Sequence, residues 1–163
     1  MTIEGGVRRA SRRDLDRVVE LWTAISDHHA SIEPLFRLRP GAAGEIRKLL
    51  AAQLEHDDTA IFVWESRQDA GPAALGGLCT VRIDRAPPIG GEVERAEITD
   101  LGVIESFRRR GIGRSLVEAA SGWVRSRGVE RVEVRVATRN PEGQAFWRAL
   151  GYDDLMDVLH RRL

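Results

Sequence analysis

The sequence predicts an α/β (α+β) fold: a mixed, mostly antiparallel central sheet of six to seven strands flanked by four helices. Two β-prone runs, 59–65 and 75–83, are separated by a polar stretch with a Gly-Pro pair and indicate an antiparallel hairpin. Helical and strand patterns alternate only in the second half of the chain, so the sheet is mixed. The 163 residues are expected to form a single domain, 1–163.

Ser11 and Asp14 have the spacing of a capping box, and apolar residues then recur at helical spacing to about Asp27. Three more helices are expected at 43–54, at 111–127 and from Asn140-Pro141 to Gly151. Strands are expected at 2–10, 59–65, 75–83, 92–103 and 131–136, with one or two more between Tyr152 and Leu163.

Composition narrows the classes of function. The formal net charge of zero argues against a general nucleic-acid binder. A single cysteine, Cys79, excludes an internal disulfide and a cysteine-based zinc site, and the spacing of His and carboxylate residues predicts no metal site. No apolar run reaches the roughly 20 residues that span a bilayer. The N-terminus has no secretory pattern, so we expect a cytoplasmic protein without membrane contact.

A strand, a glycine-containing loop and a helix follow one another around Arg108-x-x-Gly111-x-Gly113. A helix start offers unpaired N–H groups and the positive end of the helix dipole, which suit a phosphate. The loop is not a Walker motif, and Leu116 stands where a dinucleotide fingerprint has its third glycine. Taken alone, it is also compatible with a tight turn that carries solvated arginines.

A second block of residues downstream of the loop adds to what the loop indicates. It consists of Asn140, the aromatic pair Phe146-Trp147 and the triplet Leu150-Gly151-Tyr152. Together with the loop, this block resembles the GNAT superfamily of acyl-CoA-dependent N-acyltransferases, most closely over residues 97–152. The resemblance implies a GNAT-like sheet in which the fourth and fifth strands splay apart, with acetyl-CoA as co-substrate in the opening.

The resemblance also implies cofactor-binding residues. The pantetheine arm would pair with main-chain groups at the end of the fourth strand, and the pyrophosphate would lie on the N–H groups of the loop. The expected residues are Leu101, Gly102, Val103, Arg108, Arg109, Arg110, Gly111, Ile112, Gly113, Arg114, Ser115, Asn140, Phe146 and Trp147. Asn140 is equally a plain helix cap, and Phe146 a core aromatic residue.

The implied reaction is transfer of the acetyl group to a primary amine of a small molecule or peptide, by direct attack in a ternary complex. Since a free alkylamine has a pKa of about 10.4, a base must take its proton. Glu97 is the leading candidate and Asp100 the second, although strand alternation puts Asp100 on the opposite face unless a bulge intervenes. A backbone N–H near Val103 would donate a hydrogen bond to the oxyanion of the tetrahedral intermediate.

One residue departs from the family pattern. Trp147 stands where the family usually has a tyrosine that protonates the leaving thiolate, and an indole is no acid near neutral pH. The alternative is therefore a catalytically weak module of the same fold that binds acyl-CoA as a sensor. His28 and His29, at the end of the first helix, are either a base, substrate contacts or cations at a helix terminus.

The fifth strand carries a charged face, because Arg131, Glu133 and Arg135 alternate with valines. A strand deep inside a covered sheet seldom has this pattern. We therefore expect this face to meet solvent, a substrate cavity or a partner subunit, and the last of these leaves a homodimer open.

Overall fold

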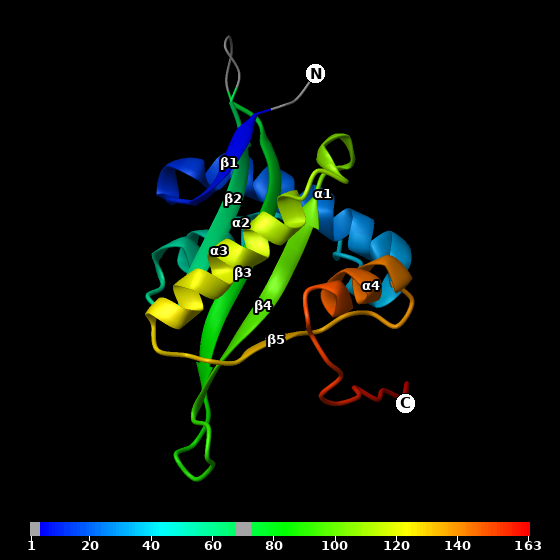
Figure 1. Cartoon of the computed structure of the whole chain (residues 1–163). Helices are drawn as coiled ribbons and strands as arrows, with labels where there is room; N and C mark the ends of the chain where they lie inside the picture. Colours follow the sequence, from blue (N-terminus) through cyan, green and yellow to red (C-terminus); the bar gives the residue numbers. More distant parts are fainter. Residues whose placement is uncertain (1–3, 68–72) are drawn as a thin grey trace.

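The computed structural model describes residues 4–67 and 73–163 (Figure 1). The strands are β1 (Gly5–Arg9), β2 (Thr59–Ser66), β3 (Leu75–Arg85), β4 (Glu94–Val103) and β5 (Val132–Val134). The helices are α1 (Leu15–Ile32), α2 (Ala43–Glu55), α3 (Ile112–Ser126) and α4 (Pro141–Ala149). Part of the expected first strand and most of the turn expected at 66–72 lie outside the described residues.

The strands form one sheet in the order β1-β2-β3-β4-β5. Neighbours from β1 to β4 are antiparallel, and β5 is parallel to β4, which confirms the mixed, mostly antiparallel sheet with four helices. The number of strands was predicted wrongly: the described residues form five strands rather than six to seven. Residues 153–163 adopt no regular structure; Val158 is their only β-branched residue, and five Asp and Arg residues interrupt their apolar side chains.

Helices cover both faces of the sheet. Figure 1 shows α3 crossing one face, with α1 and α2 on the other. A hydrophobic core lies on each face of the sheet, and successive side chains of β2 alternate between the two. Ile61 and Val63 pack in the core under α1 and α2, whereas Phe62 and Trp64 pack in the core under α3. A central sheet buried on both faces explains why β2 and β3 are apolar throughout. Within the described ranges, no helix is both long and apolar enough to cross a membrane.

Helix α1 begins as expected but ends later. The capping box of Ser11 and Asp14 is present. The helix continues past Asp27 to Ile32, and Glu33 is extended, with φ −129° and ψ 106°, because a residue before proline avoids the helical region. The extra length brings Glu33 within 3.9 Å of Arg139, in the loop before α4. The C-terminal end of α1 therefore reaches across the sheet edge where β4 and β5 part.

A bulge in β4 rearranges the predicted catalytic residues. Val81 pairs with Ile98 and Thr80 pairs with Asp100, so Thr99 has no partner on β3. The extra residue restores Glu97 and Asp100 to the same face of the sheet, which simple alternation would not do. Beside it, β5 pairs with β4 only over 96–98, while β4 runs on to Val103. The second half of β4 thus has an edge free of strand partners among the described residues.

Candidate active site

The loop between β4 and α3 has an unusual backbone. After a short 3-10 helix (Glu105–Phe107), Arg109 and Gly111 both have positive φ, 61° and 77°. Gly111 is the N-cap of α3 in the left-handed region, where only glycine has no steric cost. A non-glycine residue such as Arg109 in that region stores strain, a feature that clusters at ligand-binding sites.

This backbone leaves a run of donors without acceptors. The N–H of Arg108 donates to Glu105 O at 3.1 Å, and the N–H of Ser115 donates to Gly111 O at 3.0 Å. Between them, no protein acceptor is present in the described ranges for the backbone N–H groups of residues 109–114. Consecutive free N–H groups at a helix N-terminus form an anion site. Ser115 is not part of this run, because its N–H is used inside the helix.

The loop arginines point to different partners. Arg108 Nε donates to Val103 O at 2.9 Å, so the loop is tied to the end of β4. The Arg110 guanidinium lies 6.0 Å from the centre of the Phe107 ring, and Arg109 Nη2 lies 3.5 Å from Glu142 Oε1 of α4. Arg114, on the first turn of α3, is exposed. These four arginines lie in or next to the run of free N–H groups along the chain.

The end of β4 also offers free main-chain groups. The N–H of Ile104 donates to Gly76 O of β3 at 2.9 Å, so strand alternation turns the N–H groups of Leu101 and Val103 toward the unpaired edge. Between them, a Cβ on Gly102 would lie 2.5 Å from Ile25 of α1. Glycine at this position therefore lets α1 approach the strand closely.

Three distant segments meet at this edge. A Cβ on Gly113 would lie 3.4 Å from the Phe146 ring of α4 and 4.0 Å from Val103 Cγ2 of β4. The start of α3, the end of β4 and one face of α4 thus converge at one point. The structure brings together the two sequence blocks that the resemblance had linked.

The residues of the second block have clear local roles in α4. Asn140 Oδ1 accepts a hydrogen bond from the N–H of Gly143 at 2.9 Å, so Asn140 caps the helix. A Cβ at Gly143 would lie only 2.5 Å from Asn140 Nδ2, and this glycine therefore makes room for the cap. Trp147 is only 7% exposed and packs edge-on against two aromatic rings. Its ring centre lies 5.2 Å from that of Phe146 and 4.9 Å from that of Tyr152. Its indole belongs to the core and leaves little surface for a ligand.

The two predicted carboxylates have different surroundings. Glu97 is only 7% exposed, and both of its oxygens are paired: Arg82 Nη2 lies 2.7 Å from Oε2 and Arg135 Nε lies 3.4 Å from Oε1. Asp100 is half-buried and accepts hydrogen bonds from Trp22 Nε1 at 2.9 Å and from Thr99 Oγ1 at 2.7 Å. Glu97 is thus a buried ion-paired group, whereas Asp100 is held by neutral donors nearer the open edge.

His29 is a further candidate at this edge of the sheet, which the sequence left open as a base, a substrate contact or a cation at a helix terminus. Trp22 contacts Asp100 and Ile25 lies against Gly102, so the next residue on this stripe of α1, His29, continues toward the end of β4. Burial lowers the pKa of His29, the nearby His28 lowers it further, and the charge of Asp100 opposes both. The spacing 22, 25, 29 was the available signal, because it places all three residues on one face of the helix.

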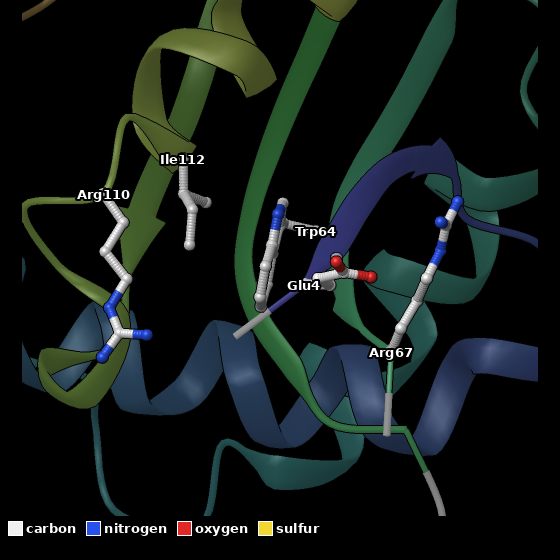
Figure 2. A pocket seen from close by; sticks show the side chains of 6 residues that line it. Glu4, Trp64, Arg67, Arg110 and Ile112 are labelled. Carbon is white, nitrogen blue, oxygen red and sulfur yellow. The ribbon is translucent and has the colours of Figure 1, made fainter. Parts of the chain in front are cut away.

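Other features lie apart from this convergence. A cavity of about 410 Å³ on the β1 side of α3 is lined by Trp64 and shares Arg110 and Ile112 with the loop before α3. Figure 2 shows Arg110 and Ile112 on one side of Trp64, with Glu4 and Arg67 on the other. Burial raises the pKa of the Cys79 thiol, which makes it an inert core residue. Within residues 4–67 and 73–163, no group of three or more His, Cys, Asp or Glu residues could hold a metal ion.

Fold and site together define a mixed-sheet α/β protein in which a loop of unpaired N–H groups lies beside an open strand edge. The model of the acetyltransferase (GNAT) family matches residues 22–152, and the chain belongs to this family. An uncharacterized N-acetyltransferase of Chlorobaculum tepidum is 43% identical over 63 residues, a match that spans 39% of this chain and 37% of that relative.

Solved structures share the fold. A mutant of the BH1408 protein of Bacillus halodurans superposes with a TM-score of 0.79 at 22% identity, covering 96% of this chain and 98% of its own. The aminoglycoside N-acetyltransferase AAC(6')-Iy in complex with CoA superposes with a TM-score of 0.77 at 18% identity, covering 100% of this chain and 97% of its own. At these identities the likeness establishes the fold.

Proposed function

We propose that the protein is an acetyl-CoA-dependent N-acetyltransferase that acetylates a primary amine of a small molecule or peptide by direct attack in a ternary complex. The observation that carries the proposal is the run of unpaired N–H groups at 109–114, beside the free edge of β4. Coenzyme A needs both features, because its pyrophosphate is an anion and its pantetheine amides pair like a strand. The CoA complex of AAC(6')-Iy, which has the same fold, supports this assignment.

In this proposal, the N–H groups of 109–114 and the surrounding arginines hold the pyrophosphate. The main-chain groups of Leu101 pair with the pantetheine arm, and Phe146 packs against it. The N–H of Val103 donates a hydrogen bond to the thioester oxygen as negative charge develops there. Trp147 and Asn140 act through packing and capping, since one is buried and the other is bonded to Gly143.

The acceptor amine enters from the α1 side of the sheet, toward which Glu97 and Asp100 both point. Glu97 would have to leave Arg82 or Arg135 to take a proton. His29 is the better-prepared base, because its lowered pKa keeps the imidazole neutral near pH 7. Asp100, whose charge raises the pKa of His29, stabilises the imidazolium once it forms.

No general acid is assigned to the leaving group. Trp147 is not an acid, and burial raises the pKa of Tyr152, which packs against Trp147 in the core. The thiol of coenzyme A has a pKa of roughly 8.5, so the thiolate leaves without prior protonation.

Two measurements distinguish an enzyme from a protein that only binds acetyl-CoA. Isothermal titration with acetyl-CoA tests the cofactor site, and absence of binding would exclude both the acetyltransferase and the acyl-CoA sensor. Release of free thiol across a panel of polyamines, aminoglycosides, amino acids and N-terminal peptides tests transfer. Tight binding without thiol release from any amine would favour the sensor alternative, which the absence of an acid at Trp147 also favours.

A further inference from the structure

A row of ion pairs connects β3, β4 and β5 on the α1 side of the sheet. Leu78 packs under α1 and α2, and alternation along β3 puts Arg82 on the same face, opposite Glu97 of β4. Each pair shares a residue with the next, so positive and negative groups alternate along the row. Its members, in order, are Arg135, Glu97, Arg82, Asp84, Arg95, Glu133, Arg131 and Glu92. The charged face that the sequence showed on the fifth strand is part of this row.

Arg135 differs from the other arginines of the row because it stands at one end. The other three each lie between two carboxylates, whereas, among the described residues, Arg135 pairs only with Glu97. Its Nε lies 3.4 Å from Glu97 Oε1, and its side chain is 75% exposed. In the part of the chain that the structure describes, its two Nη atoms have no hydrogen-bond acceptor. A guanidinium with both Nη groups unused can bind a carboxylate through two parallel hydrogen bonds.

This free guanidinium lies beside the proposed acceptor site. Arg135 is the first residue after β5, and Figure 1 shows the chain running on from β5 to α4. Glu97, its partner, lies on the same face of β4 as Asp100, and the residues opposite them on β3 are two positions apart. Two positions of a strand span about 7 Å. The acceptor side therefore has a negative group, Asp100, toward the end of β4 and a positive group, Arg135, roughly 7 Å behind it.

The order of these two charges matches a zwitterion. Asp100 attracts the ammonium form of an incoming amine, and Arg135 attracts an anion at the other end of the same molecule. One unbalanced guanidinium compensates one negative charge, which favours a carboxylate over a phosphate dianion. On the basis of the acetyl transfer proposed above, we propose that the acceptor is an amine with a carboxylate several bonds away, and that Arg135 binds this carboxylate. A dipeptide and an ω-amino acid both have the required length.

Matched acids and amides test this assignment. The acids are glycylglycine and 6-aminohexanoate, and the corresponding amides, glycylglycinamide and 6-aminohexanamide, lack the carboxylate. In NMR spectra of the arginine Nε–Hε groups, recorded with CoA present, each acid should shift the Arg135 signal and its amide should not. In thiol-release assays with acetyl-CoA, kcat/KM should be at least about tenfold higher for each acid than for its amide.

Substitutions of Arg135 should remove this preference selectively. Arg135→Gln should raise the KM for the acids to that for the amides, with an unchanged Kd for acetyl-CoA. Arg135→Lys keeps the charge but loses the paired donors, so it should keep only part of the preference. The control is Arg125→Gln, which removes an exposed arginine of α3 on the other face of the sheet and should keep the full preference.

Three results would overturn the carboxylate site: an Arg135 signal that neither acid shifts, equal kcat/KM for acids and amides in the wild type, or a preference for acids that survives in Arg135→Gln. Absence of thiol release from every amine would instead count against acetyl transfer. In that case the NMR titration alone decides whether Arg135 binds a carboxylate, so the two failures are distinguishable.

Discussion

Trp22 Nε1 donates a hydrogen bond to Asp100 Oδ1 at 2.9 Å, across 78 residues of sequence. This contact joins α1 to the bulged part of β4, where the strand loses its partner on the β5 side. It aligns the stripe of α1 that carries Ile25 and His29 with the end of the strand. The acceptor side of the proposed site is built on this alignment.

Trp22→Phe should therefore affect the acceptor more than the cofactor. The substitution keeps most of the packing and removes the donor to Asp100, which costs about 1.5–3 kcal/mol for a hydrogen bond to a charged group. We predict a raised KM for the amine with an unchanged Kd for acetyl-CoA. Trp123→Phe is the matched control, because Trp123 lies on α3 beside Arg9 and Arg127, away from the site. Equal effects of both substitutions on KM would contradict the prediction.

His29→Gln should change the pH dependence of turnover. Burial lowers the pKa of His29 below its ordinary 6.5, so the base is neutral above that range and the acidic limb of kcat/KM should lie below pH 6.5. The variant should lose this limb and much of its kcat. Steady-state rates between pH 5 and 9 measure both quantities.

The variant Glu97→Gln tests the other candidate base and is compared with His29→Gln. The sequence predicts Glu97 as the base, with turnover reduced more than acetyl-CoA affinity. If the acidic limb disappears in Glu97→Gln and persists in His29→Gln, the proton goes to Glu97 and the assignment to His29 is wrong. Loss of stability in Glu97→Gln, without a change in the limb, would indicate that its ion pairs with Arg82 and Arg135 are structural.

Asp14→Asn should weaken the fold in a pH-dependent way. Two hydrogen bonds from Arg8, at 2.7 and 2.9 Å, hold the pKa of the buried Asp14 well below its ordinary 3.8. A depressed folded-state pKa contributes stability above pH 3.8 that is lost as the pH falls further. The variant should lose about 2 kcal/mol at pH 7 and progressively less below pH 4, as urea unfolding at each pH would show. A loss that stays constant with pH would refute this account.

Local patterns predicted much of this molecule. The capping box at Ser11, the hairpin of β2 and β3, and the strand, loop and helix around Gly111 were each visible within a few residues. These features depend on backbone preferences and spacing, which a sequence displays directly. Residues 153–163 were wrongly predicted to contain strand, although their single β-branched residue and five Asp and Arg residues disfavour a strand.

Other features could be recognised only in the three-dimensional structure. The bulge at Thr99 decides which face Asp100 occupies, and it is set by pairing with β3. Gly143 makes room for the side chain of Asn140, which caps α4. The position of His29 beside the end of β4 depends on the length of α1, which continues past Asp27 to Ile32. Each of these depends on contacts between residues far apart in the sequence.

The central claim is that the loop at 109–114 holds the pyrophosphate, and paired glycine variants test it. Gly111 lies just before α3 and has a φ of 77°, and Gly128 lies after α3 and has a φ of 76°. A Cβ at either position would have no atom within 4 Å. Gly111→Ala and Gly128→Ala should therefore cost similar stability, about 1–2 kcal/mol.

Isothermal titration should be done with acetyl-CoA and with S-acetylpantetheine, which lacks the pyrophosphate. We predict that the wild type and Gly128→Ala bind acetyl-CoA at least about tenfold more tightly than S-acetylpantetheine, a difference of about 1.4 kcal/mol, and that Gly111→Ala loses most of this preference. If Gly111→Ala keeps the full preference for acetyl-CoA, the loop does not hold the pyrophosphate.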